Sequence, residues 1–205
     1  MIDDAEFYRW YGSWLHPTPS EIAGILEGVP VPWWIVGGWA MEAYTGSTRP
    51  HEDTDVAIMR GDLAAVLKHL LPEFCVWSNL SGTIRPLQGP EGLLEGCRQI
   101  WVRKDGMSPW LFDLLLTPHQ GDVWISIRDD RIRLPLEDCV FSGDGGILYL
   151  RPEIVLHLKA RLSRSKDDQD LAAALPLLDE EARRWLGEVV ERENASHPWL
   201  KRIGR

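Results

Sequence analysis

Apolar and polar residues follow two different patterns along the chain. From residue 31 to residue 134, short apolar runs rich in β-branched and aromatic side chains are separated by glycine, proline and polar turns, which is typical of strands. Strands are expected at residues 31–36, 54–59, 75–79, 99–103 and 110–116, and a hairpin at 123–127 and 131–134. Helices are expected between the first strands, at residues 39–44 and 62–71.

The pattern becomes helical beyond the glycine-rich stretch at residues 142–146. Helices are expected at residues 152–162, 167–175 and 179–192, with Pro176 separating the last two. Near the other end, Thr18-Pro19-Ser20-Glu21 has the spacing of a capping box and predicts a short helix to about residue 27. The sequence therefore predicts an α/β half followed by a helical half. We divide it into an N-terminal arm and helix (1–28), an α/β domain (29–148) and a helical C-terminal domain (149–205).

Composition and charge narrow the class of protein. The chain has 205 residues and a net charge of −9, so its average field repels nucleic acid, and a bulk nucleic-acid binder is not expected. Cys75, Cys97 and Cys139 form no C-x-x-C pair, which favours a reducing compartment over a disulfide or zinc framework. The acidic start lacks the basic region of a signal peptide, and no apolar run is long enough to span a membrane. We expect a cytoplasmic protein.

Tryptophan is unusually frequent, with 11 residues, several of them in the first fifth of the chain. They fit either core and interdomain packing or a stacking surface for a base or a sugar. The aromatic arm at residues 1–17 has no pattern that indicates a particular secondary structure.

The segment His51-Glu52-Asp53-Thr54-Asp55 is the most informative stretch. On a strand, Asp53 and Asp55 would project from the same face. Two neighbouring carboxylates repel each other, so they are either solvated or joined by a cation. A calcium-binding EF-hand loop is excluded because Ile58 stands where that loop needs glycine.

Asp113 lies in the middle of the apolar run at residues 110–116. A buried charge is costly unless it is paired or binds a metal. If this strand lies beside residues 54–59, three carboxylates meet, and an all-oxygen set of ligands suits Mg²⁺. The alternative is that Asp113 pairs with an arginine such as Arg85 or Arg103.

Two further features suit a polyphosphate. Gly37-Gly38 stands between a predicted strand and a predicted helix, where backbone N–H groups can approach a phosphate closely, although such a pair is also an ordinary tight turn. Residues 151–166 carry five basic residues and one acid in an otherwise acidic chain. This basic stretch fits either a solvated helix face or an anchor for polyphosphate.

The order of these features resembles the nucleotidyltransferase superfamily that includes DNA polymerase beta, and more narrowly its aminoglycoside 2″-adenylyltransferase and lincosamide nucleotidyltransferase branch. The resemblance spans about residues 31–170. The matching residues are Gly37-Gly38-Trp39-Ala40, Gly46, Arg49, His51-x-Asp53-x-Asp55, Pro152-Glu153-Ile154, Lys159-Ala160, Arg164, Lys166-Asp167 and Asp170. Trp39 departs from the many members that have serine after the glycines. The resemblance implies a small mixed nucleotidyltransferase sheet flanked by helices within residues 29–148, followed by the helical region.

The resemblance also implies roles for individual residues. Asp53 and Asp55 would hold two Mg²⁺ ions that bridge to a nucleoside triphosphate. Asp113 would be the third carboxylate, as a metal ligand or as the base that deprotonates the acceptor. The nucleotide-binding residues would be Gly37, Gly38, Arg49, Lys159 and Lys166.

The function that follows is transfer of a nucleoside monophosphate, AMP from ATP, onto a hydroxyl of a small cationic acceptor such as an aminoglycoside antibiotic. Three alternatives remain open. The first is a non-catalytic interaction module on the same fold. The second is an enzyme that modifies an RNA end or a protein. The third is an iron site made of His51, Asp53 and either His119 or His157.

Overall fold

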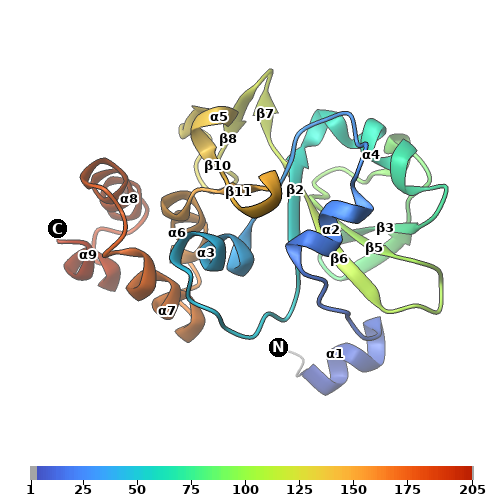
Figure 1. Ribbon diagram of the computed structural model, residues 1–205, viewed down its shortest axis with the longest axis horizontal. Coiled ribbons are helices and arrows are strands. Elements are labelled where there is room, and N and C mark those ends of the chain that lie inside the picture. Colours follow the sequence, from blue (N-terminus) through green and yellow to red (C-terminus); the bar gives the residue numbers. More distant parts are fainter. Residues whose placement is uncertain (1–3, 205) are drawn as a thin grey trace.

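The apolar runs of the first 150 residues form a mixed β-sheet in the computed structural model, which describes residues 4–204 (Figure 1). The strands of this sheet are β1 (Trp33–Ile35), β2 (Asp55–Met59), β3 (Cys75–Leu80), β4 (Thr83–Pro86), β5 (Gln99–Arg103), β6 (Trp110–Thr117), β10 (Val140–Ser142) and β11 (Leu148–Leu150). Their order across the sheet is β10-β11-β1-β2-β6-β5-β3-β4. The pairs β1/β11 and β2/β6 are parallel, and the other neighbours are antiparallel.

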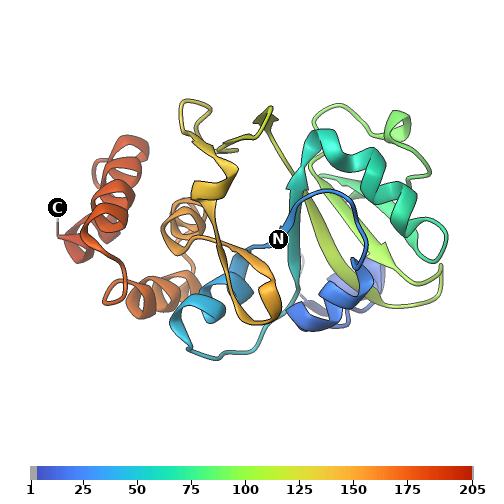
Figure 2. The same cartoon turned by 45° about the horizontal axis from the view of Figure 1, so that its top comes forward.

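One face of this sheet is mostly apolar. Val56 and Ile58 on β2 and Leu114 on β6 are inaccessible or nearly so, and they belong to the hydrophobic core. Helices α2 (Pro19–Ile25) and α4 (Leu63–Leu70) lie against the sheet (Figures 1 and 2). The predicted capping box of α2 is present, because the Thr18 N–H donates to Glu21 Oε2 at 2.7 Å and the Glu21 N–H donates to Thr18 Oγ1 at 3.3 Å.

A smaller antiparallel sheet follows β6. It consists of β7 (His119–Gln120), β8 (Val123–Ile125) and β9 (Arg133–Pro135), and the short helix α5 (Leu136–Cys139) then leads back to the main sheet. Single 3₁₀ turns occur at Arg60–Asp62, Pro90–Gly92 and Asp144–Gly146.

The remaining helices form the other end of the molecule. Helix α3 (Gly37–Thr45) follows β1 directly and packs against α6 (Pro152–Ala160) and α7 (Ser165–Ala174). Helices α8 (Glu180–Glu193) and α9 (Pro198–Ile203) complete the layer on the side away from β3 and β5 (Figure 1).

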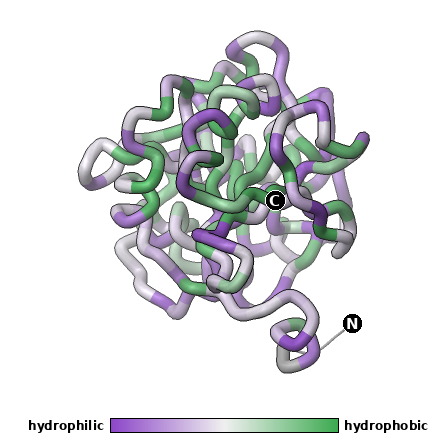
Figure 3. The backbone as a smooth tube through the Cα atoms, turned by 90° about the vertical axis from the view of Figure 1, so that its right-hand side faces the viewer, coloured by the Kyte–Doolittle hydropathy of each residue, from purple (hydrophilic) through white to green (hydrophobic). Residues whose placement is uncertain are grey.

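The N-terminal arm contains helix α1 (Asp4–Tyr11), which lies at the edge of the molecule (Figure 3). After it, Trp14 forms a parallel bridge with Trp110 at the start of β6. Trp101 packs against Phe7, Tyr11 and Trp14 with ring centroids 5.1–6.2 Å apart. These aromatic residues therefore pack against one another over the sheet; the first three residues of the predicted arm lie outside the described part.

The predicted fold class is confirmed: a mixed sheet is flanked by helices and followed by a helical region. Several short elements were not predicted from the sequence: β4, β7, β10, β11, α5, α9 and the helix in the arm. They have two to eight residues, too few for a clear hydrophobic period. The hairpin strands are also shorter than expected, because Ser126 and Asp129 form turn hydrogen bonds. Among the described residues, no helix is both long and apolar enough to cross a membrane.

Candidate active site

Asp55 and Asp113 lie next to each other on the face of the sheet opposite the apolar one. They are direct register partners on the parallel strands β2 and β6. Direct partners project from the same face of a sheet with their Cβ atoms close together. Asp113 is 6% exposed and Asp55 is half-buried, so the fold places two neighbouring carboxylates largely out of water.

Asp53 stands just before β2 and is exposed. The residue between the two aspartates, Thr54, is fully buried, and its Oγ1 donates to the Pro17 carbonyl at 2.6 Å. The Thr54 carbonyl also accepts from the Asp113 N–H at 3.1 Å. Thr54 thus fixes the backbone that carries Asp53 and Asp55 against β6.

The electrostatics of the pair are unfavourable for two negative charges. Burial raises the pKa of Asp55 to about 7, and the Asp53 carboxylate adds to the rise, while Lys159, Lys166 and Arg164 oppose it. Burial also raises the pKa of Asp113 well above its usual value, and repulsion by Asp55 and Asp53 adds to this effect. A divalent cation between the carboxylates would remove this cost.

The partners of Asp113 are on β5. Gln99 Nε2 donates to Asp113 Oδ2 at 2.8 Å, and Trp101 lies directly opposite Asp113 in the register. Asp113 Oδ1 is buried without a hydrogen-bond partner among the described residues. The alternative that Asp113 pairs with Arg85 or Arg103 is wrong: Arg103 instead lies over the rings of Trp77 and Trp110.

The glycine turn is shaped around the same carboxylates. Gly37 has a φ of +67°, and a Cβ added there would lie 2.5 Å from Asp55 Oδ2. A Cβ added at Gly38 would lie 2.8 Å from His51 Nδ1 and still closer to the Arg49 guanidinium. Gly37 needs glycine because of its positive φ and the close approach of Asp55, whereas a side chain at position 38 would have to displace the Arg49 guanidinium and the His51 ring. The predicted helix begins at Gly37, two residues earlier than expected, and ends at Gly46 in a left-handed C-cap.

His51 has structural contacts. Its Nε2 lies 2.7 Å from Glu42 Oε2, and its ring stacks on Trp39 with centroids 3.9 Å apart and planes 19° apart. Trp39, which replaces the serine of many nucleotidyltransferases, thus supports the loop that carries the aspartates.

The basic residues predicted to bind the nucleotide each form an ion pair with an acidic residue other than Asp55 and Asp113. Arg49 Nε lies 3.2 Å from Asp170 Oδ1, and Lys159 forms an ion pair with the other oxygen of Asp170. Lys166 Nζ lies 2.8 Å from Glu52 Oε2, next to Asp53. The basic stretch is therefore more than a solvated helix face: Lys159 is buried, and Lys159 and Lys166 act electrostatically on Asp55.

The residues fit a hard divalent cation. The unpartnered Asp113 Oδ1 and the all-oxygen donor set suit Mg²⁺, whose charge would offset the repulsion and burial that raise the pKa of Asp55 and Asp113. Within residues 4–204, no three His, Cys, Asp or Glu side chains already converge on one ion. The structure therefore preassembles Asp55 and Asp113, and Asp53 would have to turn inward to join them.

The iron site is not assembled. His119 Nε2 accepts the Gly61 N–H at 2.9 Å, and His157 Nε2 lies 2.9 Å from Ser126 Oγ. With His51 held by Glu42, the three histidines are engaged at separate places.

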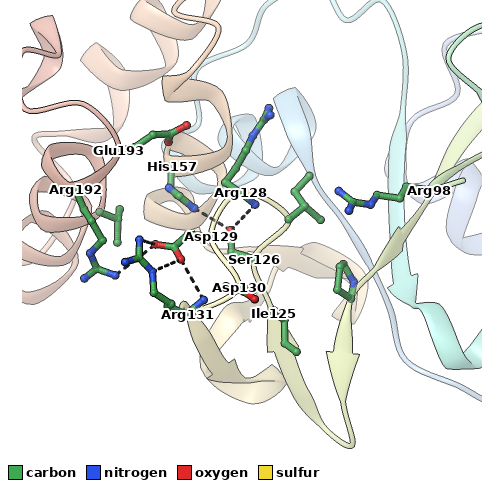
Figure 4. Close-up of a pocket in the computed structure, with 13 residues that line it drawn as sticks. Arg98, Ile125, Ser126, Arg128, Asp129, Asp130, Arg131, His157, Arg192 and Glu193 are labelled. Atoms are coloured by element: carbon green, nitrogen blue, oxygen red, sulfur yellow. Dashed lines mark hydrogen bonds and ion pairs between the residues drawn. The ribbon is translucent and has the colours of Figure 1, made fainter. Parts of the chain in front are cut away.

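Two pockets lie near the site, and the first of them shares Gln99 with it. The first, of about 310 Å³, is lined mainly by apolar residues of β1, β2, β6 and α6. The second, of about 620 Å³, lies between the β8–β9 hairpin and helices α6 and α8 and is lined by charged residues (Figure 4). In it Asp129 is hydrogen-bonded to Arg131 at 2.7 Å and paired with Arg192 at 3.6 Å. Arg98 and Ile127 line both pockets.

Three residues of the site were not assigned to it from the sequence: Gln99 on Asp113, Asp170 between Arg49 and Lys159, and Arg164, whose charge acts on Asp55. Asp170 and Arg164 stood within the stretch that carried the resemblance. Gln99 had no such signal, because only the antiparallel register of β5 and β6 places it beside Asp113.

Comparisons with known proteins concern the family and the fold. The family model described as aminoglycoside-2″-adenylyltransferase matches residues 20–87. A crystal structure of ANT(2″)-Ia in complex with adenylyl-2″-tobramycin has a TM-score of 0.53 and 17% identity, covering 84% of this chain and 95% of that one. A solution structure of the antibiotic-resistance factor ANT(2″)-Ia has a TM-score of 0.52 and 16% identity, covering 89% and 92%. No curated protein matches the sequence significantly.

The family model covers the glycine turn, Asp53 and Asp55, and the two structures share the fold along most of the chain. Together they confirm the resemblance to the aminoglycoside 2″-adenylyltransferase branch and support the prediction of an enzyme: residues 20–87 match the family model, and the fold is similar to that of ANT(2″)-Ia.

Proposed function

We propose that this protein transfers AMP from ATP to a hydroxyl group of a small acceptor in a Mg²⁺-dependent reaction. The observation that carries the proposal is the pair Asp55 and Asp113, which are register partners on adjacent strands beside a glycine turn. The family model and the ligand of the ANT(2″)-Ia crystal structure make aminoglycosides the first acceptors to test.

Asp53, Asp55 and Asp113 would hold the Mg²⁺ ions, which neutralise the phosphates and the developing charge when bound. Asp113 lies farther from the glycine turn than Asp55, because β6 is beyond β2 in the sheet. We therefore assign to Asp113 the removal of the proton from the acceptor hydroxyl, and Gln99 orients it.

The glycine turn and the cations would bind the triphosphate. The N–H groups of Gly37 and Gly38 open helix α3, where the positive end of the helix favours an anion. Arg49 lies against Gly38. Lys159 and Lys166 are close enough to Asp55 to counteract part of the rise in its pKa. These residues would orient the nucleotide and stabilise the leaving pyrophosphate.

The test is pyrophosphate release from each nucleoside triphosphate over a panel of hydroxyl acceptors with Mg²⁺. Asp53→Ala should reduce release by at least about 10²–10³-fold, the scale for loss of an electrostatic catalytic group. Asp144→Ala removes an exposed acid outside the site and serves as the matched control. Retained turnover in Asp53→Ala would refute the metal assignment.

A non-catalytic module and an enzyme acting on RNA or a protein are the competing functions. The first predicts no pyrophosphate release and no nucleotide binding by calorimetry. The second predicts release only with macromolecular acceptors, and the net charge of −9 argues against RNA. The proposal includes a cytoplasmic location, where the proposed substrate ATP is available.

A further inference from the structure

The last part of the N-terminal arm, residues 11–17, is hydrogen-bonded to both strands that carry the site aspartates. At the start of β6, the Trp110 N–H donates to the Ser13 carbonyl at 2.9 Å, and the Leu15 N–H donates to the Trp110 carbonyl at 2.8 Å. The indole N–H of Trp110 also donates to the Tyr11 carbonyl at 2.6 Å. This segment therefore lies along the start of β6, close to the aspartate of that strand.

The same segment ends at β2. The Pro17 carbonyl accepts the Thr54 hydroxyl at 2.6 Å. Thr54 is fully buried and stands between Asp53 and Asp55. Its own carbonyl accepts the Asp113 N–H at 3.1 Å. Thr54 thus connects the arm, the two aspartates beside it and the strand that carries the third.

The aromatic side chains of the arm also pack beside Asp113. Trp101 on β5 is the direct register partner of Asp113 and is 6% exposed. The ring of Trp14 packs against the rings of Trp101 and Trp110, with centroids 5.1 and 6.2 Å apart. The Trp101 side chain counteracts part of the rise in the pKa of Asp113, so it acts directly on that carboxylate. The arm therefore reaches Asp113 through Trp101 as well as through the main chain.

The aspartates stand where the strands provide little support. Asp55 is the first residue of β2, and Asp53 precedes the strand. A chain held by few main-chain bonds opens easily, whereas a metal site needs its ligands within about 0.5 Å of the productive geometry. The arm joins the starts of β2 and β6 at this place, and it precedes residue 20, where the match to the family model begins.

We propose that the N-terminal arm is a positioning element of the active site, which acts through Thr54 and Trp14 to hold Asp53, Asp55 and Asp113 in place for Mg²⁺. The inference rests on the proposed function and adds to it a part of the chain that the nucleotide and the acceptor need not touch. Groups that orient metal ligands typically contribute about 10–100-fold to metal affinity or activity.

The Thr54 hydroxyl provides the sharpest test. Thr54→Val keeps the branched shape but leaves the Pro17 carbonyl without its donor. In calorimetry with a non-hydrolysable ATP analogue present, the Kd for Mg²⁺ should rise about 10–100-fold. Pyrophosphate release at limiting Mg²⁺ should fall in proportion, and excess Mg²⁺ should restore most of it. Thr54→Ser, which keeps the hydroxyl, should retain most of the Mg²⁺ affinity.

Thr45→Val is the matched control. The Thr45 hydroxyl also donates to a backbone carbonyl, that of Met41 at 2.8 Å, but this bond lies within helix α3 and does not involve the arm. Thr45→Val should therefore leave the Kd for Mg²⁺ unchanged. Urea unfolding of each variant identifies the conditions in which it is folded, so that a loss of stability is not read as a loss of metal affinity.

A second pair of variants tests the arm without changing the buried Thr54. Trp14→Ala removes the half-buried ring that packs on Trp101 and should also weaken Mg²⁺ binding. Trp10→Ala changes a tryptophan of the same arm that is 65% exposed, and it should bind Mg²⁺ as the unmodified protein does.

The outcomes separate this inference from the proposed function. Unchanged Mg²⁺ affinity in Thr54→Val and Trp14→Ala, or losses of equal size in Thr54→Ser or Thr45→Val, would overturn the positioning role and leave nucleotidyl transfer standing. Absence of both pyrophosphate release and Mg²⁺-dependent nucleotide binding in the unmodified protein would overturn the proposed function, and the positioning role with it.

Discussion

Without a bound metal, the fold disfavours the charged form of the Asp55 side chain. The pKa of Asp55 is about 7 in the folded protein and about 4 in the unfolded chain. Between these two pH values, Asp55 is protonated in the folded protein and has lost its proton in the unfolded chain. The contribution of Asp55 to stability therefore falls as the pH rises through this window.

Asp55→Asn should accordingly raise the free energy of unfolding of the metal-free protein at pH 8 and abolish AMP transfer. The gain should shrink toward pH 4, where Asp55 is protonated in the folded state and about half protonated in the unfolded chain. Urea unfolding in EDTA at several pH values measures it, with Asp144→Asn as the exposed control. A variant that is less stable than the unmodified protein at pH 8 would contradict the electrostatic cost assigned to Asp55.

Gly38 shows how closely side chains approach the backbone in the turn. Gly38→Ala should weaken binding of an ATP analogue, because its Cβ would displace Arg49 and His51. Gly24→Ala in helix α2, where a Cβ meets nothing within 4 Å, should be neutral or stabilise by up to about 1 kcal/mol. Calorimetry and thermal unfolding of both variants make the comparison; equal nucleotide affinity in the two would show that the turn tolerates a side chain.

At the scale of elements, long periodic segments could be predicted from the sequence and short ones could not. The strand at residues 54–59 and the helix at 179–192 have enough apolar positions to define a period, whereas β10 and β11 have three residues each. These short strands form because β11 pairs with β1 and β10 pairs with β11, which is tertiary information.

In the site too, some residues could be predicted from local sequence and others depend on tertiary structure. Asp53 and Asp55 could be recognised from the His-x-Asp-x-Asp spacing where β2 begins, and Asp113 from a charge in an apolar run. That Gln99 rather than an arginine accompanies Asp113 depends on the register between β5 and β6, and no pattern within either strand determines that register.

Asp170 joins two elements to the site. It lies on α7 and pairs both with Arg49, from the loop after α3, and with Lys159 on α6. Asp170→Asn should destabilise the protein by about 1–3 kcal/mol, since it removes the charged partner of the half-buried Arg49 and one of the two carboxylates that pair with the buried Lys159. Glu73→Gln, which breaks the exposed pair with Lys104, should cost at most about 1 kcal/mol. Urea unfolding of both variants tests this; equal losses would show that the buried network contributes no more than a surface pair.

At the scale of the whole molecule, the site draws on both halves: the sheet provides the aspartates, and the helical region provides Lys159 and Lys166. A ligand that contacts both halves should stabilise the folded chain. Mg²⁺ with a non-hydrolysable ATP analogue at 100 times its Kd should add about 2.7 kcal/mol to the free energy of unfolding. The melting temperature of the unmodified protein should therefore rise, and that of Asp55→Asn should not. A rise of equal size in both would place the nucleotide elsewhere.

The parallel pairing of β1 with β11 has a consequence for synthesis of the chain. Ile35 finds its register partner at Tyr149, so the edge of β1 stays open until most of the polypeptide has left the ribosome. Such distant pairing slows folding, and an unpaired strand edge invites contacts with other chains. A fragment that stops before Leu148 would therefore be prone to aggregation even though it contains all three aspartates.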